Sequence, residues 1–157
     1  MNEMARLFGS VRGDNMLARL ERLHAEFVDA LAGLNGLVRA SAPSREAIAE
    51  ARLRLMHTTI AHTKYMELDV YPTVFRALSP VEAEPIRELR RRAIAVRIEL
   101  SRHIATWPIE RVIRDWAGFQ ETTIRADLNR GMRAQLHALL PILSREDFGG
   151  EAVAEAA

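Results

Sequence analysis

The sequence of 157 residues contains no cysteine, only 6% aromatic residues and no long uninterrupted apolar stretch. The lack of cysteine excludes disulfides, thiolate zinc sites, iron–sulfur clusters and cysteine nucleophiles. No window approaches the roughly 18 uncharged apolar residues of a transmembrane helix, so no membrane partner is expected. The first residues also lack the apolar core of a signal peptide, which makes the cytoplasm the expected location.

An excess of charge of one sign is also missing. The formal net charge is +1, so global electrostatics does not point to nucleic acid or to an acidic membrane surface. Arginines are concentrated between Arg87 and Arg114, but they spread around the predicted helix and few aromatic residues accompany them. Because this pattern is typical of a solvated helix face, a nucleic-acid partner is not expected.

Motifs of familiar catalytic chemistry are absent as well. The sequence has no Gly-rich phosphate loop, no HExxH and no GxSxG. Serine, histidine and aspartate occur, but without a spacing that marks a catalytic triad. An enzymatic function is therefore not indicated.

The chain does contain helical periodicity along almost its whole length, and β-type alternation is nowhere sustained. Helices of this length with short connections favour antiparallel neighbours. The predicted fold class is therefore all-α, an up-down-up-down four-helix bundle with a short extra helix before the last one. The predicted domains are a flexible N-terminus over 1–13, the bundle over 14–144 and a disordered acidic tail over 145–157. The predicted helices span about 14–40, 45–78, 82–107, 109–116 and 119–143.

Capping residues and prolines support these boundaries. Asp14 and Ser44 are the expected N-caps of the first two helices. Pro72 lies within the second helix, where it removes a backbone donor and should kink the last turns. Pro108 suits the first turn of the short helix.

His24 and Glu67 each interrupt a helix stripe that is otherwise apolar. His24 falls between Leu20 and Phe27 on the first helix, and Glu67 lies mid-stripe on the second. A buried imidazole or carboxylate needs a partner. At a rise of ~1.5 Å per residue, antiparallel packing places His24 and Glu67 within about one helical turn in height, with His62 level with His24. A hydrogen-bonded His–Glu pair, a metal site and a misassigned helix face are the three interpretations. The inner stripe predicted for the second helix is Met56, Ile60, Thr63, Glu67, Val70, Val74 and Leu78, with Leu55, Thr59 and Met66 beside it.

The segment from His62 to Pro72, HTKYMELDVYP, resembles the second-helix motif of the hemerythrin-like (HHE cation-binding) family. His24 lies where the first-helix histidine of that family would be, and the segment 131–141, GMRAQLHALLP, is similar to the second occurrence of the motif. The resemblance covers roughly residues 15 to 143. It implies a four-helix bundle whose members hold two irons with about five histidines and two carboxylates.

Several of the ligand positions implied by this resemblance carry other residues. Met66 stands where a glutamate is expected, and Gly131 and Gln135 replace a histidine and a glutamate. No histidine lies near Ala93 on the third helix. A di-iron centre is therefore not expected, and the remaining candidate metal ligands for one iron or zinc are His24, His62 and Glu67.

Three functions follow as hypotheses from these observations. The first is a hemerythrin-like bundle with a lost or altered metal centre, acting as a binding, sensory or regulatory module. The second is an active metalloprotein with a mononuclear or atypical iron or zinc site for O2, NO or redox chemistry. The third is a structural or partner-binding bundle, with a homodimer or another protein as its partner.

Overall fold

The computed structural model describes residues 3–124 and 128–145, and all regular elements in that part of the chain are helices, without a β-strand. The predicted all-α class is therefore confirmed. None of the described helices is both long and apolar enough to cross a membrane. The elements are α1 (Glu3–Val38), α2 (Arg45–Tyr65), the π-helix η1 (Met66–Val70), α3 (Tyr71–Ala77), α4 (Pro80–Thr106), α5 (Ile109–Arg114), α6 (Trp116–Ile124) and α7 (Leu128–Leu143).

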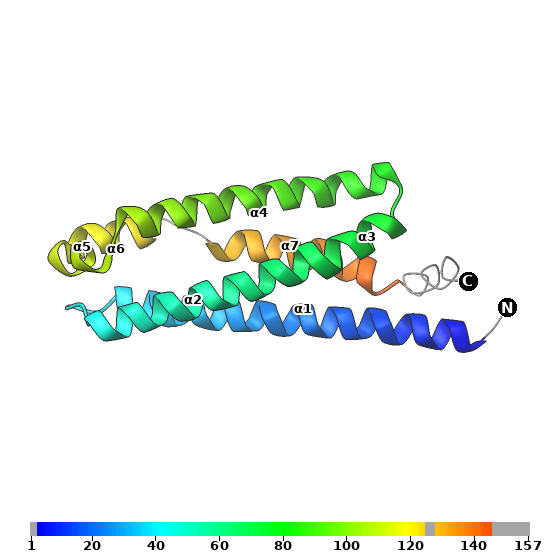
Figure 1. Ribbon diagram of the computed structural model, residues 1–157, viewed down its shortest axis with the longest axis horizontal. Coiled ribbons are helices and arrows are strands. Elements are labelled where there is room, and N and C mark those ends of the chain that lie inside the picture. Colours follow the sequence, from blue (N-terminus) through cyan, green and yellow to red (C-terminus); the bar gives the residue numbers. More distant parts are fainter. Residues whose placement is uncertain (1–2, 125–127, 146–157) are drawn as a thin grey trace.

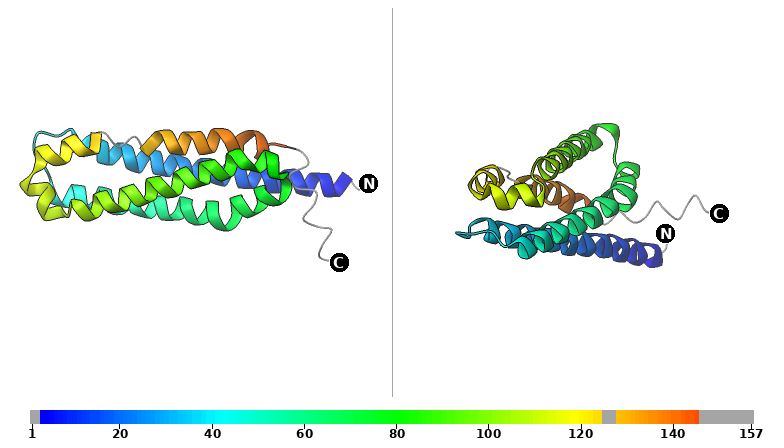
Figure 2. Two further views of the ribbon diagram at one scale, coloured as in Figure 1. Left: turned by 90° about the horizontal axis from the view of Figure 1, so that it is seen from above. Right: turned by 60° about the vertical axis from the view of Figure 1, so that its left-hand side comes forward.

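The longer helices lie lengthwise beside one another, and the short ones turn the chain at the two ends (Figures 1 and 2). Chain direction reverses between α1 and α2, again where α3 leads into α4, and again through α5 and α6 before α7. The most extensive contacts join α2 to α1, while α7 packs against both α1 and α4. Direct contact between α2 and α4 is slight, so this pair forms the loosest side of the assembly.

Side-chain caps fix several of the helix starts. Ser44 accepts a hydrogen bond from the amide of Ala47, which confirms it as the N-cap of α2. Ser79 and Glu82 form a reciprocal capping box at the start of α4, and Pro80 occupies its first turn. Asp115 accepts from the amide of Gly118 at 3.1 Å and so caps the first turn of α6.

The first helix begins earlier than predicted. It starts at Glu3, so Asp14 lies inside α1 and is not its N-cap. The residues before Asp14 contain no proline and include good helix formers, so the helix continues through them. The predicted flexible N-terminus therefore falls largely within α1, whereas the predicted tail, apart from Arg145, lies outside the described residues.

The predicted kink at Pro72 corresponds to a widened turn just before it. Residues Met66–Val70 form a π-helix, in which the amide of Tyr71 donates to the carbonyl of Met66, five residues back. A proline ring collides with the carbonyl four residues earlier and offers no amide donor, and a wider turn relieves both problems. The extra residue also rotates the following side chains, which places both Met66 and Tyr71 in the interior.

The buried face of α2 is shifted from the predicted stripe. Leu55 and His62 are 4% and 6% exposed, whereas Met56 and Ile60 are 43% and 46% exposed. The stripe holds only from the end of η1 onward, where Val70 and Val74 are fully buried. The shift arises because α2 is covered by α1 but barely touched by α4, so the apolar residues on its α4 side have no covering helix.

Buried apolar residues form two separate clusters along the molecule. One joins the earlier part of α1 to η1, α3, α4 and α7, and it includes Leu20 and Val70. The other joins the later part of α1 to α2, α5 and α6, and it includes Ile48 and Val112. The interval between the two clusters falls at His24 on α1 and at His62 on α2, so the interior becomes polar there.

Candidate functional site

Two connected hollows lie along the loose side of the molecule between α2 and α4. The first, which we call the chamber, has a volume of about 510 Å³ and lies between α2, η1, α4 and α7. The second, which we call the groove, has a volume of about 770 Å³ and runs on toward α6. The residues that line both are Thr59, Thr63, Val96, Arg97 and Leu100, so one hollow continues into the other.

The walls of the chamber are mostly apolar, with a few polar groups among them. Its apolar lining includes Phe27, Met66, Leu89, Ala93, Val96 and Met132. Its polar lining includes His62, Tyr71, Gln135 and Arg97. Such a combination is typical of binding sites for small organic molecules, in which a few hydrogen-bonding groups orient a largely apolar ligand.

His24 and His62 lie near each other between the two apolar clusters, and their ring nitrogens lack hydrogen-bonding partners in the described part of the chain. The Nδ1 atom of His24 is buried and has no partner, and the buried imidazole of His62 makes no hydrogen bond there either. Burial lowers the pKa of His62 to about 4, and the nearby His24 and Arg97 contribute to the shift. Burial also lowers the pKa of His24, helped by Arg133 and His137. Both rings are therefore neutral at physiological pH, and His62, which lines the chamber, can offer a lone pair to a ligand there.

Tyr71 and Gln135 form a buried hydrogen-bonded pair on another wall of the chamber. The side-chain amide of Gln135 donates to the hydroxyl of Tyr71 at 3.0 Å. Burial raises the pKa of Tyr71 to about 12, and the negative charge of Glu67 contributes, so the phenol stays protonated. Because its oxygen accepts from Gln135, its hydrogen is left for another acceptor.

Glu67 lies on the α4 side of η1 and does not pair with His24. Its carboxylate accepts from Nε and Nη2 of Arg90, at 3.1 and 2.7 Å, and Arg97 lies 3.8 Å away. The Glu67 side chain is 25% exposed, so it is not the deeply buried acid that the sequence predicted. The structure thus brings His24 and His62 together and assigns Glu67 to a bridge between η1 and α4.

The donor set does not match the metal centre that the family resemblance implies. In residues 3–124 and 128–145, no group of three or more His, Cys, Asp or Glu side chains is placed to hold a metal ion. The carboxylate of Glu67 is neutralised by arginine, and the amide of Gln135 is engaged with Tyr71. The two imidazoles alone are fewer ligands than a stable zinc or iron site requires.

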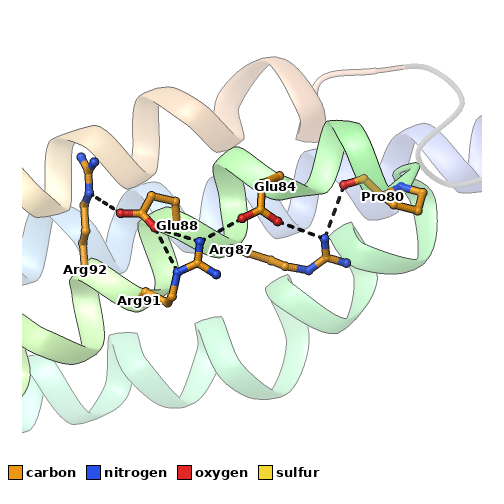
Figure 3. Close-up of polar contacts among 6 residues, drawn as sticks. All are labelled: Pro80, Glu84, Arg87, Glu88, Arg91 and Arg92. Atoms are coloured by element: carbon orange, nitrogen blue, oxygen red, sulfur yellow. Dashed lines mark hydrogen bonds and ion pairs between the residues drawn. The ribbon is translucent and has the colours of Figure 1, made fainter.

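The arginine-rich outer surface of α4 is occupied by ion pairs, as Figure 3 shows. Arg91 bridges Glu84 and Glu88 at 2.9 and 2.8 Å, and Arg92 pairs with Glu88 at 3.0 Å. These side chains are all well exposed, so each pair contributes little to stability. The arrangement agrees with the interpretation of this stretch as a solvated face.

The pattern of the sequence does not identify every residue that lines the site. In the sequence, Tyr71 stands out only as part of a motif and Gln135 only as a replacement for a carboxylate. The signal for their pairing is weak: two polar residues on helical faces that are otherwise apolar.

Comparisons of this chain with protein-family models, with curated proteins and with solved structures found no match.

Proposed function

We propose that this chain is a hemerythrin-like up-and-down four-helix bundle that binds a small organic ligand in its chamber and acts as a binding or sensory module. The observation that carries the proposal is the chamber itself, where polar side chains with free hydrogen-bonding capacity interrupt an apolar lining. The hemerythrin-like assignment rests on the motif from His62 to Pro72 together with His24. The up-and-down arrangement is supported by the reversals of chain direction.

The size and chemistry of the chamber favour a small, mostly apolar molecule. Its volume of about 510 Å³ lies within the range of small-molecule sites. The neutral imidazole of His62 and the protonated phenol of Tyr71 offer an acceptor and a donor on its walls. Leaving such groups buried without partners costs free energy, and a ligand that hydrogen-bonds to them recovers part of it.

A neutral fluorescent probe, N-phenyl-1-naphthylamine, tests the proposal. We expect saturable binding of one probe per chain, with strong enhancement of its emission in the apolar interior. Ala93→Trp places a large side chain in the chamber lining and should reduce the affinity at least tenfold. Ala61→Trp, at an exposed position of α2 outside both hollows, is the matched control and should bind as the wild type does.

Two outcomes count against a ligand-binding chamber. One is the absence of saturable binding by the unmodified chain, and the other is equal binding by the Ala93→Trp and Ala61→Trp variants. Metal analysis of the same preparations tests the mononuclear alternative. Stoichiometric iron or zinc that is lost in both His24→Ala and His62→Ala would favour that alternative over an organic ligand.

The exposed apolar side chains favour a second candidate function, a homo-oligomeric bundle. Met56 and Ile60 on α2 and Ile104 on α4 are each between 42% and 46% exposed. Together they line the groove, and an apolar area of this kind often marks a protein interface. A second copy of the chain covering this side would bury them. Sedimentation across a wide concentration range tests this candidate, which requires a dimer that Ile60→Glu dissociates.

A further inference from the structure

The groove is bridged by arginines at both ends. Near the chamber, Arg97 lines the hollow and lies 3.8 Å from Glu67. At the far end, Arg52 reaches from α2 across to the residue that follows α4, where its Nη1 donates to the carbonyl of Trp107 at 2.7 Å. Between these bridges the walls are largely aliphatic, with Leu34, Leu55, Ile60, Leu100 and Ile104 among them.

Arg52 is the one groove residue with a buried donor that has no partner in the described part of the chain. Its Nη2 atom is buried and unpaired, although Nη1 is satisfied. The guanidinium also lies over the ring of Phe119, with 5.1 Å from Cζ to the ring centroid. An unpaired charged donor in such surroundings is costly, and a planar carboxylate is the partner whose geometry matches a guanidinium.

The charges around the groove favour an anion over a cation. Arg52, Lys64 and Arg97 line it, with Glu99 as the acidic counterpart. His103 also lies in the lining, where burial and the nearby Arg52 lower its pKa, so it adds neither positive nor negative charge at physiological pH. The lining is therefore cationic at its rim and aliphatic along its length, which matches a molecule with an anionic head and an apolar tail.

We infer that the groove binds an amphiphilic carboxylate, with its head at Arg52 and its hydrocarbon tail running between α2 and α4 toward the chamber. The inference deepens the proposed function, because the tail uses the continuity between groove and chamber. Because Nη2 is covered in the structure, this binding requires the guanidinium to turn toward the groove as the carboxylate enters. The continuity with an interior hollow favours this ligand over an acidic helix of a partner, whose width would confine it to the groove mouth.

Displacement of N-phenyl-1-naphthylamine by decanoate and by 1-decanol tests the inference. The two competitors share a tail and differ in charge, and both are used below the concentrations at which they aggregate. We expect decanoate to bind at least tenfold more tightly than 1-decanol, the advantage expected of a charge-assisted hydrogen bond. Arg52→Met should remove that advantage while leaving the affinity for 1-decanol unchanged.

Two further variants keep the test decisive. Arg54→Met, an exposed arginine on the same helix that pairs with Asp29 outside the groove, is the matched control and should retain the preference for decanoate. Ile104→Trp narrows the groove near Arg52 without removing a hydrogen bond, and it should weaken both competitors. This variant is informative even if Arg52→Met fails to fold.

The outcomes separate this inference from the proposed function. If the probe binds but decanoate and 1-decanol compete equally, the carboxylate inference is wrong while the chamber proposal stands. The carboxylate inference is also wrong if the preference for decanoate survives in Arg52→Met but is lost in Arg97→Met, which would place the head at the other end. If the probe itself does not bind, the proposed function fails and this inference fails with it.

Discussion

The two sides of α2 are built in different ways. Toward α1, it contributes fully buried side chains such as Ile48 and Leu55 to a continuous apolar cluster. Toward α4, its apolar side chains stay about half exposed, and the gap is spanned by long arginine side chains from both helices. The comparison indicates that the α1 side supplies most of the stability, whereas the α4 side is left open, which is where we propose that a ligand binds.

The largest expected effect comes from a matched pair of truncations on the two sides. Ile48→Ala, on the α1 side of α2, truncates a side chain that is 0% exposed in the apolar cluster shared with α1, and it should cost about 2–5 kcal/mol of unfolding free energy. Ile60→Ala, on the α4 side, should cost less than about 1 kcal/mol, because little area is buried there. Urea denaturation measures both values. Equal losses would contradict the division of α2 into a structural side and an open side.

Acid should weaken the fold through His62. Its pKa is about 4 in the folded chain and about 6.5 in an unfolded one, so between these values only the unfolded state takes up the proton. The unfolding free energy should therefore fall by about 3 kcal/mol as the pH drops from 6.5 to 4. His24 and His103, whose pKa values are also lowered, act in the same direction.

Denaturation at a series of pH values checks this dependence. His62→Gln should flatten the slope between pH 6.5 and pH 4, since glutamine does not titrate. His57→Gln, on the exposed side of α2, is the matched control. A slope that is as steep in His62→Gln as in the wild type would show that His62 is not buried in its neutral form.

The buried pair of Tyr71 and Gln135 should have an intermediate effect. Tyr71→Phe leaves the amide of Gln135 without its acceptor and should cost about 1–3 kcal/mol. Combining it with Gln135→Met should recover part of that loss, because neither buried polar group is then left unpaired. A double-mutant cycle from urea denaturation gives the coupling free energy. A coupling near zero would mean that the two side chains do not interact.

The smallest expected effect concerns the bridge between η1 and α4. Glu67→Gln removes the charge that pairs with Arg90, and partly exposed ion pairs contribute less than about 1 kcal/mol. The loss should shrink further at high salt, which screens exposed charges. Denaturation at low and high ionic strength provides the measurement. A loss of several kcal/mol that is independent of salt would mean that α4 is anchored through this bridge.

The fold is largely predictable from the sequence, because helical periodicity and capping residues act locally. Ser44 confirms this for α2, and the boundary near residue 107 agrees closely with the end of α4 at Thr106. The start of the first helix is not predictable, since a plausible cap such as Asp14 does not stop a helix whose preceding residues also favour it. The predicted last helix from about 119 corresponds instead to the separate helices α6 and α7.

The candidate site is less predictable, for a physical reason. Periodicity identifies apolar residues but not which helix covers them, so it places Met56 and Ile60 in the interior although they flank an open groove. The π-helix adds one residue to the register, so Tyr71 lies in the interior whereas Glu67 faces α4. No sequence pattern marks Arg52 as a binding residue. Its guanidinium is held by Trp107 and Phe119, which lie far along the chain, and this placement leaves Nη2 buried without a partner.

The most direct test is a methyl NMR titration of methionine-labelled protein with N-phenyl-1-naphthylamine. Met66 and Met132 line the chamber, whereas Met16 is 8% exposed in an apolar cluster and lines neither hollow. We predict saturable shifts of the Met66 and Met132 methyl signals, caused by the ring current of the bound probe, with little change at Met16. Signals that all stay unmoved, or that move equally at all three residues, would contradict a ligand site in the chamber.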